Sequence, residues 1–461
     1  MFLPIKERME NEVTVQKNLT SGSVFKNIVY FSLPYMLSFF LQTLYGMADL
    51  FIVGQFNATD SITAVSIGSQ VMHMLTVMIV GLAMGATVTI GRAVGAKREE
   101  EAAGYVGNTV TLFVLGSLVM TAILLLLVRP IVSVMSTPQE AVDGTVRYLT
   151  ICFAGIPFIT AYNIIGSIFR GLGDSKSPMY FIAAACVCNI GLDYLFIGVF
   201  RMGASGAALG TTLSQTLSVI LALTVIVKRK TGLALQKKHF RLRQKTTGAI
   251  ARIGVPIALQ DGFIQIAFIV ITIIANRRGL NDAAAVGIVE KVIGILFLVP
   301  SSMLSTVSAL AAQNVGANEY RRARLTLRYG IAITVSFGIV MATAVQFIAP
   351  QIVGLFEENT EVIRLGSQYL HSYVWDCIFA GIHFCFSGYF CAFGKSGISF
   401  LHNALSIVLV RIPVSYLASN MCADTLFPMG LAAPLGSLLS VLICVVAYAV
   451  LMGRQKKDGK L

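Results

Sequence analysis

The stretch VTLFVLGSLVMTAILLLLV, residues 110–128, contains no charged side chain. A run of this length forms an α-helix long enough to cross about 30 Å of hydrocarbon. Strands of a membrane β-barrel would be about half as long and would alternate apolar with polar residues. The stretch therefore predicts a transmembrane α-helix.

Similar apolar runs recur along the whole chain. Of its 461 residues, 56% are hydrophobic and only 12% are charged, whereas a soluble domain carries about 25% charged residues. This composition predicts an all-α integral membrane protein with twelve transmembrane helices. The predicted spans lie near residues 28–53, 62–88, 104–128, 146–168, 179–200, 205–228, 252–276, 284–309, 325–349, 366–390, 397–418 and 430–453.

The positions of Lys and Arg predict the orientation in the membrane. If both termini are cytoplasmic, 27 of the 35 Lys and Arg residues fall in cytoplasmic segments, as the positive-inside rule requires. This predicts cytoplasmic tails at residues 1–27 and 454–461 and a basic cytoplasmic linker at residues 229–251. The bias also accounts for the net charge of +13 without a nucleic-acid partner.

The two halves of the chain repeat each other. At an offset of 221 residues, Val94-Gly95-Ala96 recurs as Val315-Gly316-Ala317 and Phe169 recurs as Phe390. The chain is therefore predicted to contain two six-helix lobes, an N-lobe at residues 28–228 and a C-lobe at residues 252–453. Because six is even, both lobes enter the membrane from the same side, as two parallel bundles related by a pseudo-twofold axis along the membrane normal.

Four polar residues are expected at one depth in the N-lobe. Asn189 and Asp193 are four apart and share a helix face, and Asp49, Asp193 and Thr211 each lie roughly 7–10 Å below the outer surface at 1.5 Å per residue. Such a cluster of oxygen atoms suits cation coupling, either as ligands of Na⁺ or as carboxylates that share a proton. The alternative is that Asp49 and Asp193 only form hydrogen bonds with neighbouring helices.

At this point the sequence resembles the multidrug and toxic compound extrusion (MATE) family. The resemblance rests on TLYGMADLFIVGQF (43–56), GRAVGAKREEEA (91–102), FRGLGDSKSPM (169–179) and NIGLDYLFIGVF (189–200), and the DinF-like bacterial branch is most similar. It implies a cation-coupled efflux antiporter in a bacterial inner membrane, with two lobes that alternate between inward and outward openings.

The C-lobe has different acidic residues within its spans, namely Asp261, Glu290 and Asp376. Other branches of the family carry coupling acids in the seventh and tenth spans. These residues could therefore form a second cation site or bind a cationic drug, and structural polar packing is the alternative. Arg411, within the eleventh span, either extends to the membrane interface or pairs with an acid.

Two functions remain open. Efflux of amphipathic, mostly cationic drugs or toxins by Na⁺ or H⁺ antiport fits the five intramembrane acids and the 17 Met residues, since methionine-rich walls accept varied ligands. A lipid-linked precursor flippase would need several basic residues in its cavity, and only Lys291 and Arg411 lie within spans.

An enzyme is not expected, because no H-E-x-x-H, G-x-S-x-G or Walker-type sequence occurs. We expect no cofactor apart from the coupling ion, no partner besides substrates and membrane lipids, and a monomer.

Overall fold

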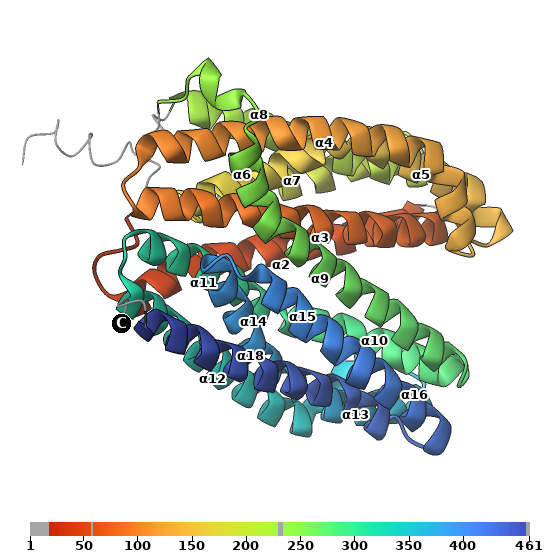
Figure 1. Ribbon diagram of the computed structural model, residues 1–461. Coiled ribbons are helices and arrows are strands. Elements are labelled where there is room, and N and C mark those ends of the chain that lie inside the picture. The colour runs from red at the N-terminus through yellow and green to blue at the C-terminus, as the bar shows by residue number, and fades with distance from the viewer. Residues whose placement is uncertain (1–17, 57–58, 229–233, 458–461) are drawn as a thin grey trace, which may run out of the picture. The chain divides into compact units, whose positions relative to one another are not determined.

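The computed structural model describes residues 18–56, 59–228 and 234–457, and every element in these ranges is helical (Figure 1). Parts of the predicted tails and linker, at residues 1–17, 229–233 and 458–461, lie outside the described residues. The long helices in chain order are α2 (Val24–Phe56), α3 (Thr59–Gly95), α4 (Glu99–Val134), α5 (Val142–Ala154), α6 (Ile156–Gly171), α7 (Lys176–Asp193), α8 (Ala204–Lys228), α9 (Gln244–Asn276), α10 (Leu280–Leu296), α11 (Leu298–Gly316), α12 (Tyr320–Gly354), α13 (Thr360–Tyr373), α14 (Asp376–Ala392), α15 (Ser396–Ser406), α16 (Ile412–Met421) and α18 (Ala432–Lys457). Short elements are η1 (Gln139–Ala141), η2 (Tyr194–Val199), η3 (Lys237–Phe240), η4 (Ile407–Arg411) and α17 (Phe427–Gly430).

The helices confirm the predicted twelve-span, all-helical fold. In the described part of the chain, ten helical stretches are long and apolar enough to cross a membrane, and two bent pairs bring the number to twelve. The first pair bends by 51° between α5 and α6, and the second bends by 41° between α13 and α14. The bends fall at Gly155 and beside Asp376, which are equivalent positions of the sequence repeat.

Two spans contain a π-helical turn. In the fifth span, η2 follows α7 directly after Asp193, and in the eleventh span, η4 ends at Arg411. A π-turn places one extra residue in a helical turn, and such turns are frequent at functional sites. Both turns therefore adjoin a charged residue that has to be oriented inside a membrane span.

The chain divides into two compact units. Within the described ranges, unit 1 contains Asn18 and residues 33–254, and unit 2 contains Leu19–Ser32 and residues 255–457. Both boundaries fall inside helices, since the first turns of α2 belong to unit 2 and the first turns of α9 belong to unit 1. Helix α9 begins at Gln244, inside the segment predicted as a linker, and the predicted lobe limits stay a prediction.

Unit 1 is arranged around α6, the second helix of its bent span. Helix α6 packs against α3, α4 and α8. The start of α9 also packs closely on α3, because a Cβ atom at Gly254 would overlap the backbone of Leu82 and one at Gly85 would overlap the carbonyl group of Ile250. Small residues permit such close approach of helices within a membrane. The core includes Phe153 and Phe169, which are fully buried.

The segment before α9 is attached to α4 of unit 1. Asn108 donates to the carbonyl oxygen of His239 at 3.0 Å and accepts from the backbone amide of Arg243 at 2.8 Å. The buried His239 side chain also contacts Glu100 at 3.0 Å. These bonds fix η3 against α4.

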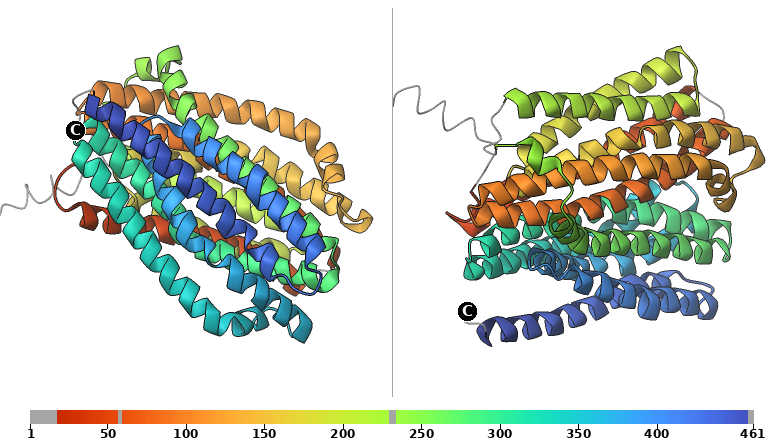
Figure 2. Two further views of the ribbon diagram at one scale, coloured as in Figure 1. Left: turned by 60° about the horizontal axis from the view of Figure 1, so that its bottom comes forward. Right: turned by 45° about the horizontal axis from the view of Figure 1, so that its top comes forward.

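Unit 2 is arranged around α14, the second helix of the other bent span. Helix α14 packs against α11, α12 and α18 (Figure 2). The segment before α2 completes this unit, because the Leu19 amide donates to Gln313 at 3.1 Å and Arg322 donates to the carbonyl oxygens of Ser21 and Gly22 at 3.1 and 2.8 Å. Each unit thus includes the segment that precedes the long first helix of the other unit.

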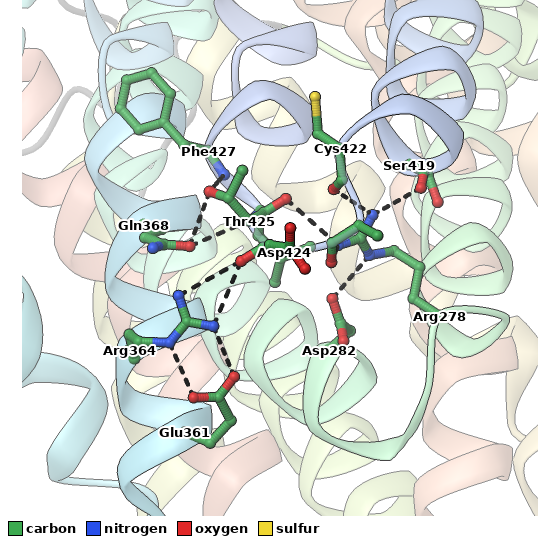
Figure 3. A network of polar contacts seen from close by, with 12 residues as sticks. Arg278, Asp282, Glu361, Arg364, Gln368, Ser419, Cys422, Asp424, Thr425 and Phe427 are labelled. Carbon is green, nitrogen blue, oxygen red and sulfur yellow. Dashed lines mark hydrogen bonds and ion pairs between the residues drawn. The ribbon is translucent and has the colours of Figure 1, made fainter.

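Two arginines hold the segment between α16 and α17 (Figure 3). Arg278 donates to Asp282 at 2.8 Å and to the backbone carbonyl groups of Ser419, Cys422, Ala423 and Thr425. Arg364 pairs with Glu361 at 2.6 Å and donates to the carbonyl group of Asp424. The segment is therefore attached to the turn between α9 and α10, through Arg278, and to α13, through Arg364.

Candidate functional site

In unit 1, the Asp49 carboxylate is held by the sixth span. Asp49 lies on α2 and is 5% exposed. Thr211, on α8, donates its hydroxyl hydrogen to Asp49 Oδ2 at 3.0 Å. This bond joins two of the four residues that the sequence predicted at one depth.

The other two predicted residues lie beside Asp49. Asn189 and Asp193 occupy one face of α7 and are fully buried. Both side chains interact electrostatically with the Asp49 carboxyl group. The structure therefore brings Asp49, Asn189, Asp193 and Thr211 together, which we call the unit 1 cluster. Its role in cation coupling stays a prediction.

Most oxygen atoms of the unit 1 cluster have no hydrogen-bond donor. Within the described ranges, Asp49 Oδ1, Asn189 Oδ1 and both carboxylate oxygens of Asp193 are buried without a hydrogen-bond partner. A buried carboxylate is costly unless it is paired, protonated or bound to a metal ion. The cluster can therefore accept either a proton, shared between two adjacent carboxylates, or a small cation that prefers oxygen ligands.

A sodium ion would need amide and hydroxyl ligands here as well as carboxylates. The described residues include no group of three or more His, Cys, Asp or Glu side chains that could hold a metal ion. Asn189 and Thr211 would supply the additional oxygen atoms. The donor set thus fits Na⁺ better than a transition metal, which prefers imidazole or thiolate ligands.

Gly210 sets the distance between α7 and α8 at this cluster. A Cβ atom at position 210 would overlap Asp193 Oδ1 and would lie 3.6 Å from Asn189 Nδ2. Gly206 and Gly210 are four apart and share one face of α8, and a Cβ at Gly206 would likewise meet Phe196 and Ile197 at 3.1–3.2 Å. The absence of side chains on this face lets the Asp193 carboxylate lie against α8.

A second polar contact lies one helical turn from the cluster. Gln215 Nε2 donates to the Tyr45 hydroxyl at 3.3 Å. Tyr45 precedes Asp49 by four residues and Gln215 follows Thr211 by four. The two hydrogen bonds therefore join α2 and α8 at successive helical turns. Sequence analysis missed this pair, although the matching four-residue spacings could have revealed it.

In unit 2, two of the three predicted acids lie near a buried arginine. Glu290 on α10 accepts a hydrogen bond from the Tyr369 hydroxyl at 3.2 Å. Asp376, the first residue of α14, is 1% exposed and lies beside Ser437. The charges of both acids interact with that of Arg411, and we call Glu290, Asp376 and Arg411 the unit 2 cluster.

Asp261, the third predicted acid of unit 2, is half-buried. It lies on α9 and its carboxyl group is beside the Gln260 side chain. In the described part of unit 2, no hydrogen bond or ion pair joins Asp261 to Glu290 or Asp376. A role of Asp261 in binding a substrate or a second cation stays a prediction.

Comparison with known proteins follows this division into two helical units. A family model described as MatE matches residues 34–195 and 256–417. The chain belongs to the MATE family. The two matched segments begin at Pro34 and Pro256, so the MATE family model also matches the two copies that the sequence repeat revealed.

Named relatives of this MATE transporter are similar over most of their length. The "Probable multidrug resistance protein YoeA" of Bacillus subtilis (strain 168) is 26% identical over 457 residues, covering 98% of each chain. The "Multidrug export protein MepA" of Staphylococcus aureus (strain MSSA476) is 25% identical over 377 residues, covering 81% of this chain and 82% of the relative. None of these similarities identifies a branch of the family, so the DinF-like assignment stays a prediction.

Solved structures confirm the fold. The structure described as "Crystal structure of MATE in complex with MaL6" has a TM-score of 0.86 at 22% identity, covering 96% of this chain and 98% of the other. The chain is thus a multi-pass membrane transporter with the fold of the MATE proteins.

Proposed function

We propose that this MATE transporter exports amphipathic, mostly cationic organic compounds from a bacterial cell in exchange for Na⁺ or H⁺. The proposal places the protein in the inner membrane as a monomer, with both termini cytoplasmic and with membrane lipids as its surroundings. The unit 1 cluster is the coupling site. Relatives named as multidrug resistance and export proteins support the choice of substrate class.

The observation that carries the proposal is the pair of adjacent buried carboxylates, Asp49 and Asp193, with three oxygen atoms that lack a donor. Two such carboxylates repel each other when both are charged. Binding one proton or one Na⁺ removes this repulsion, so the cluster responds to the concentration of the coupling ion.

Coupled exchange also requires a difference between states. A ligand shifts a conformational equilibrium only by its differential affinity for the two states. In our proposal, the coupling ion favours release of the drug in the outward-open state, and loss of the ion to the cytoplasm permits the next drug molecule to bind. Drug affinity in the outward-open state is then lower when the unit 1 cluster holds its cation.

The first prediction concerns Asp193. Purified protein in sealed vesicles should transport a cationic dye when either a Na⁺ gradient or a pH gradient is imposed alone, and the effective gradient identifies the ion. Asp193→Asn should reduce this transport at least about tenfold, because one neutral amide replaces the carboxylate that binds the ion. Asp60→Asn changes an exposed aspartate and should transport at the wild-type rate.

Normal coupled transport by Asp193→Asn would rule out the unit 1 cluster as the coupling site. Size-exclusion profiles of both variants should match wild type, since neutralising one acid makes a helix no harder to insert.

The lipid flippase remains the alternative, and the basic residues argue against it. Lys291 is exposed, and Arg411 is buried close to two acids. Arg411 is thus compensated, and Lys291 alone is too few for a cavity that holds a pyrophosphate group. Rescue of a strain that lacks its cell-wall precursor flippase, without protection of a pump-deficient strain from any cationic antiseptic, would favour the flippase instead.

A further inference from the structure

Arg411 is a buried base within a membrane span. The residue is 9% exposed, although a charged side chain at such a depth is costly unless it is compensated. It donates a hydrogen bond to the Tyr373 hydroxyl, and its guanidinium carbon lies 5.1 Å from the centre of the Phe268 ring and 5.7 Å from that of Tyr373. Two rings and one hydroxyl group therefore fix the position of the charge.

The backbone around Arg411 supports this position. Arg411 ends the π-helical turn η4. A Cβ atom at Gly436 of α18 would lie 3.4 Å from Arg411 Cβ and 2.8 Å from Ser406 Oγ, so α18 packs closely against this turn. The Cβ end of the Arg411 side chain is therefore confined by α18.

The charges near Arg411 do not balance. Glu290 accepts from the Tyr369 hydroxyl, and the Tyr369 ring packs edge-on at 5.5 Å against that of Tyr373, the partner of Arg411. Asp376 is the second acid whose charge acts on this guanidinium group. In the described part of the chain, no ion pair within 4.0 Å joins Arg411 to either acid, and Glu290 Oε2, Asp376 Oδ1 and Arg411 Nε are buried without a hydrogen-bond partner. The other base in these spans, Lys291, is exposed. With both acids ionised, the unit 2 cluster carries one net negative charge.

We propose that Arg411 is a fixed counter-cation that determines the charge selectivity of the unit 2 cluster. It neutralises one of the two acids, so that the net charge of the cluster matches a substrate with one positive charge, and it weakens the attraction for a dication more than that for a monocation. The inference deepens the proposed export of organic cations and rests on it for the identity of the ligand. Arg411 thus acts as a specificity-determining residue.

The binding test uses Arg411→Gln, which removes the charge but keeps a long polar side chain. Equilibrium affinities are measured for tetraphenylphosphonium, a monocation, and paraquat, a dication whose two charges lie close together, in detergent at one fixed pH and ionic strength. Coulomb repulsion scales with ligand charge. Affinity for the monocation should rise about tenfold and affinity for the dication about a hundredfold, so that the logarithmic shift doubles.

Two control variants separate charge from packing. Arg411→Lys keeps a positive charge and should leave the ratio of the two affinities near the wild-type value. Lys291→Gln removes an exposed base beside Glu290 and should also leave it unchanged. Equal shifts for the monocation and the dication in Arg411→Gln, or no shift in either, would overturn the proposal.

A second measurement requires no ligand and therefore distinguishes failure of this inference from failure of the proposed function. Arg411→Gln leaves two acids without their counter-cation and should lower the apparent melting temperature in detergent. Asp376→Asn in the same chain returns the cluster to one net negative charge and should recover much of that loss. If the two substitutions were simply additive, Arg411 would not be the counter-cation of this acid.

Discussion

A single hydrogen atom, in place of a side chain at Gly210, allows Asp193 to lie against α8. Position 210 has no room for a methyl group, because the Asp193 carboxylate already occupies the space that it would need. The same carboxylate lies beside Asp49, so displacing it changes the unit 1 cluster directly. At this scale the geometry of the cluster depends on how closely two helices approach.

We therefore predict that Gly210→Ala reduces coupled transport by about tenfold or more. Crowding a tight contact typically costs about 1–3 kcal/mol, and here the strain displaces a carboxylate of the proposed coupling site. Gly191→Ala is the matched control, because it lies on α7 and a Cβ there meets nothing within 4 Å. Vesicle transport should separate the two variants, and equal rates would show that helix spacing at Gly210 is unimportant.

Sequence analysis predicted the members of the unit 1 cluster but not all the contacts around it. The depth of a residue follows from the helical rise per residue, and the four-residue spacing places Asn189 and Asp193 on one face. These two properties of helix geometry were sufficient to predict the cluster. The partners of Arg411 were not predictable, since Tyr373 and Phe268 reach it only through the rotation and tilt of three different helices. The grouping of Asp261 with Glu290 and Asp376 stays a prediction.

At the scale of helices, hydropathy predicts that a span exists but does not predict where it bends. The break between α5 and α6 has a local signal, since Gly155 precedes a helix with Pro157 in its first turn. The break before Asp376 has no proline, and the apolar sequence continues across it. The π-helical turns η2 and η4 likewise leave no pattern in composition, because a single extra residue per turn changes only the direction of later side chains.

The segment between α16 and α17 provides a prediction about one connection. Arg278→Ala should lower the free energy of unfolding by about 2–4 kcal/mol, because it leaves a partly buried acid and several carbonyl groups without their donor. The side chains of Arg278 and Asp282 are only 7% and 15% exposed. Thermal denaturation in detergent measures the loss. Arg277→Ala changes the adjacent, exposed arginine and should have an effect below about 0.5 kcal/mol.

At the scale of the whole molecule, the sequence repeat predicts two six-helix lobes, and the contacts define two units with different limits. The first turns of α2 belong to unit 2, and the first turns of α9 belong to unit 1. The repeat is a pattern of single positions, so it shows that two copies exist but not which helical turns pack with which copy. The first turns of α9 pack on α3 through Gly85 and Gly254. Repetition therefore predicts the number of units better than their limits.

Asn108 tests how firmly the segment before α9 is attached to unit 1. Asn108→Ala removes the donor to His239 and the acceptor for Arg243, which should cost about 1–3 kcal/mol. We expect trypsin to cleave between Lys237 and Lys245 about tenfold faster, because cleavage requires the backbone to leave its bound position. Asn420→Ala, at an exposed position of unit 2, is the control and should be cleaved at the wild-type rate. Cleavage of Asn108→Ala at the wild-type rate would show that other contacts hold η3.

The N-terminal part of unit 2 also has a consequence for biosynthesis. Leu19 is bonded to Gln313 and Asn314, which follow it by 294 and 295 positions. A ribosome adds about 5–20 residues per second, so the Leu19 amide emerges about 15–60 s before its partner has been translated. Throughout that time the nascent chain has to keep this segment in solution or at the membrane surface, while the helices of unit 1 are inserted one after another. Leu19 thus reaches its native contacts only after the whole of unit 1 has been translated.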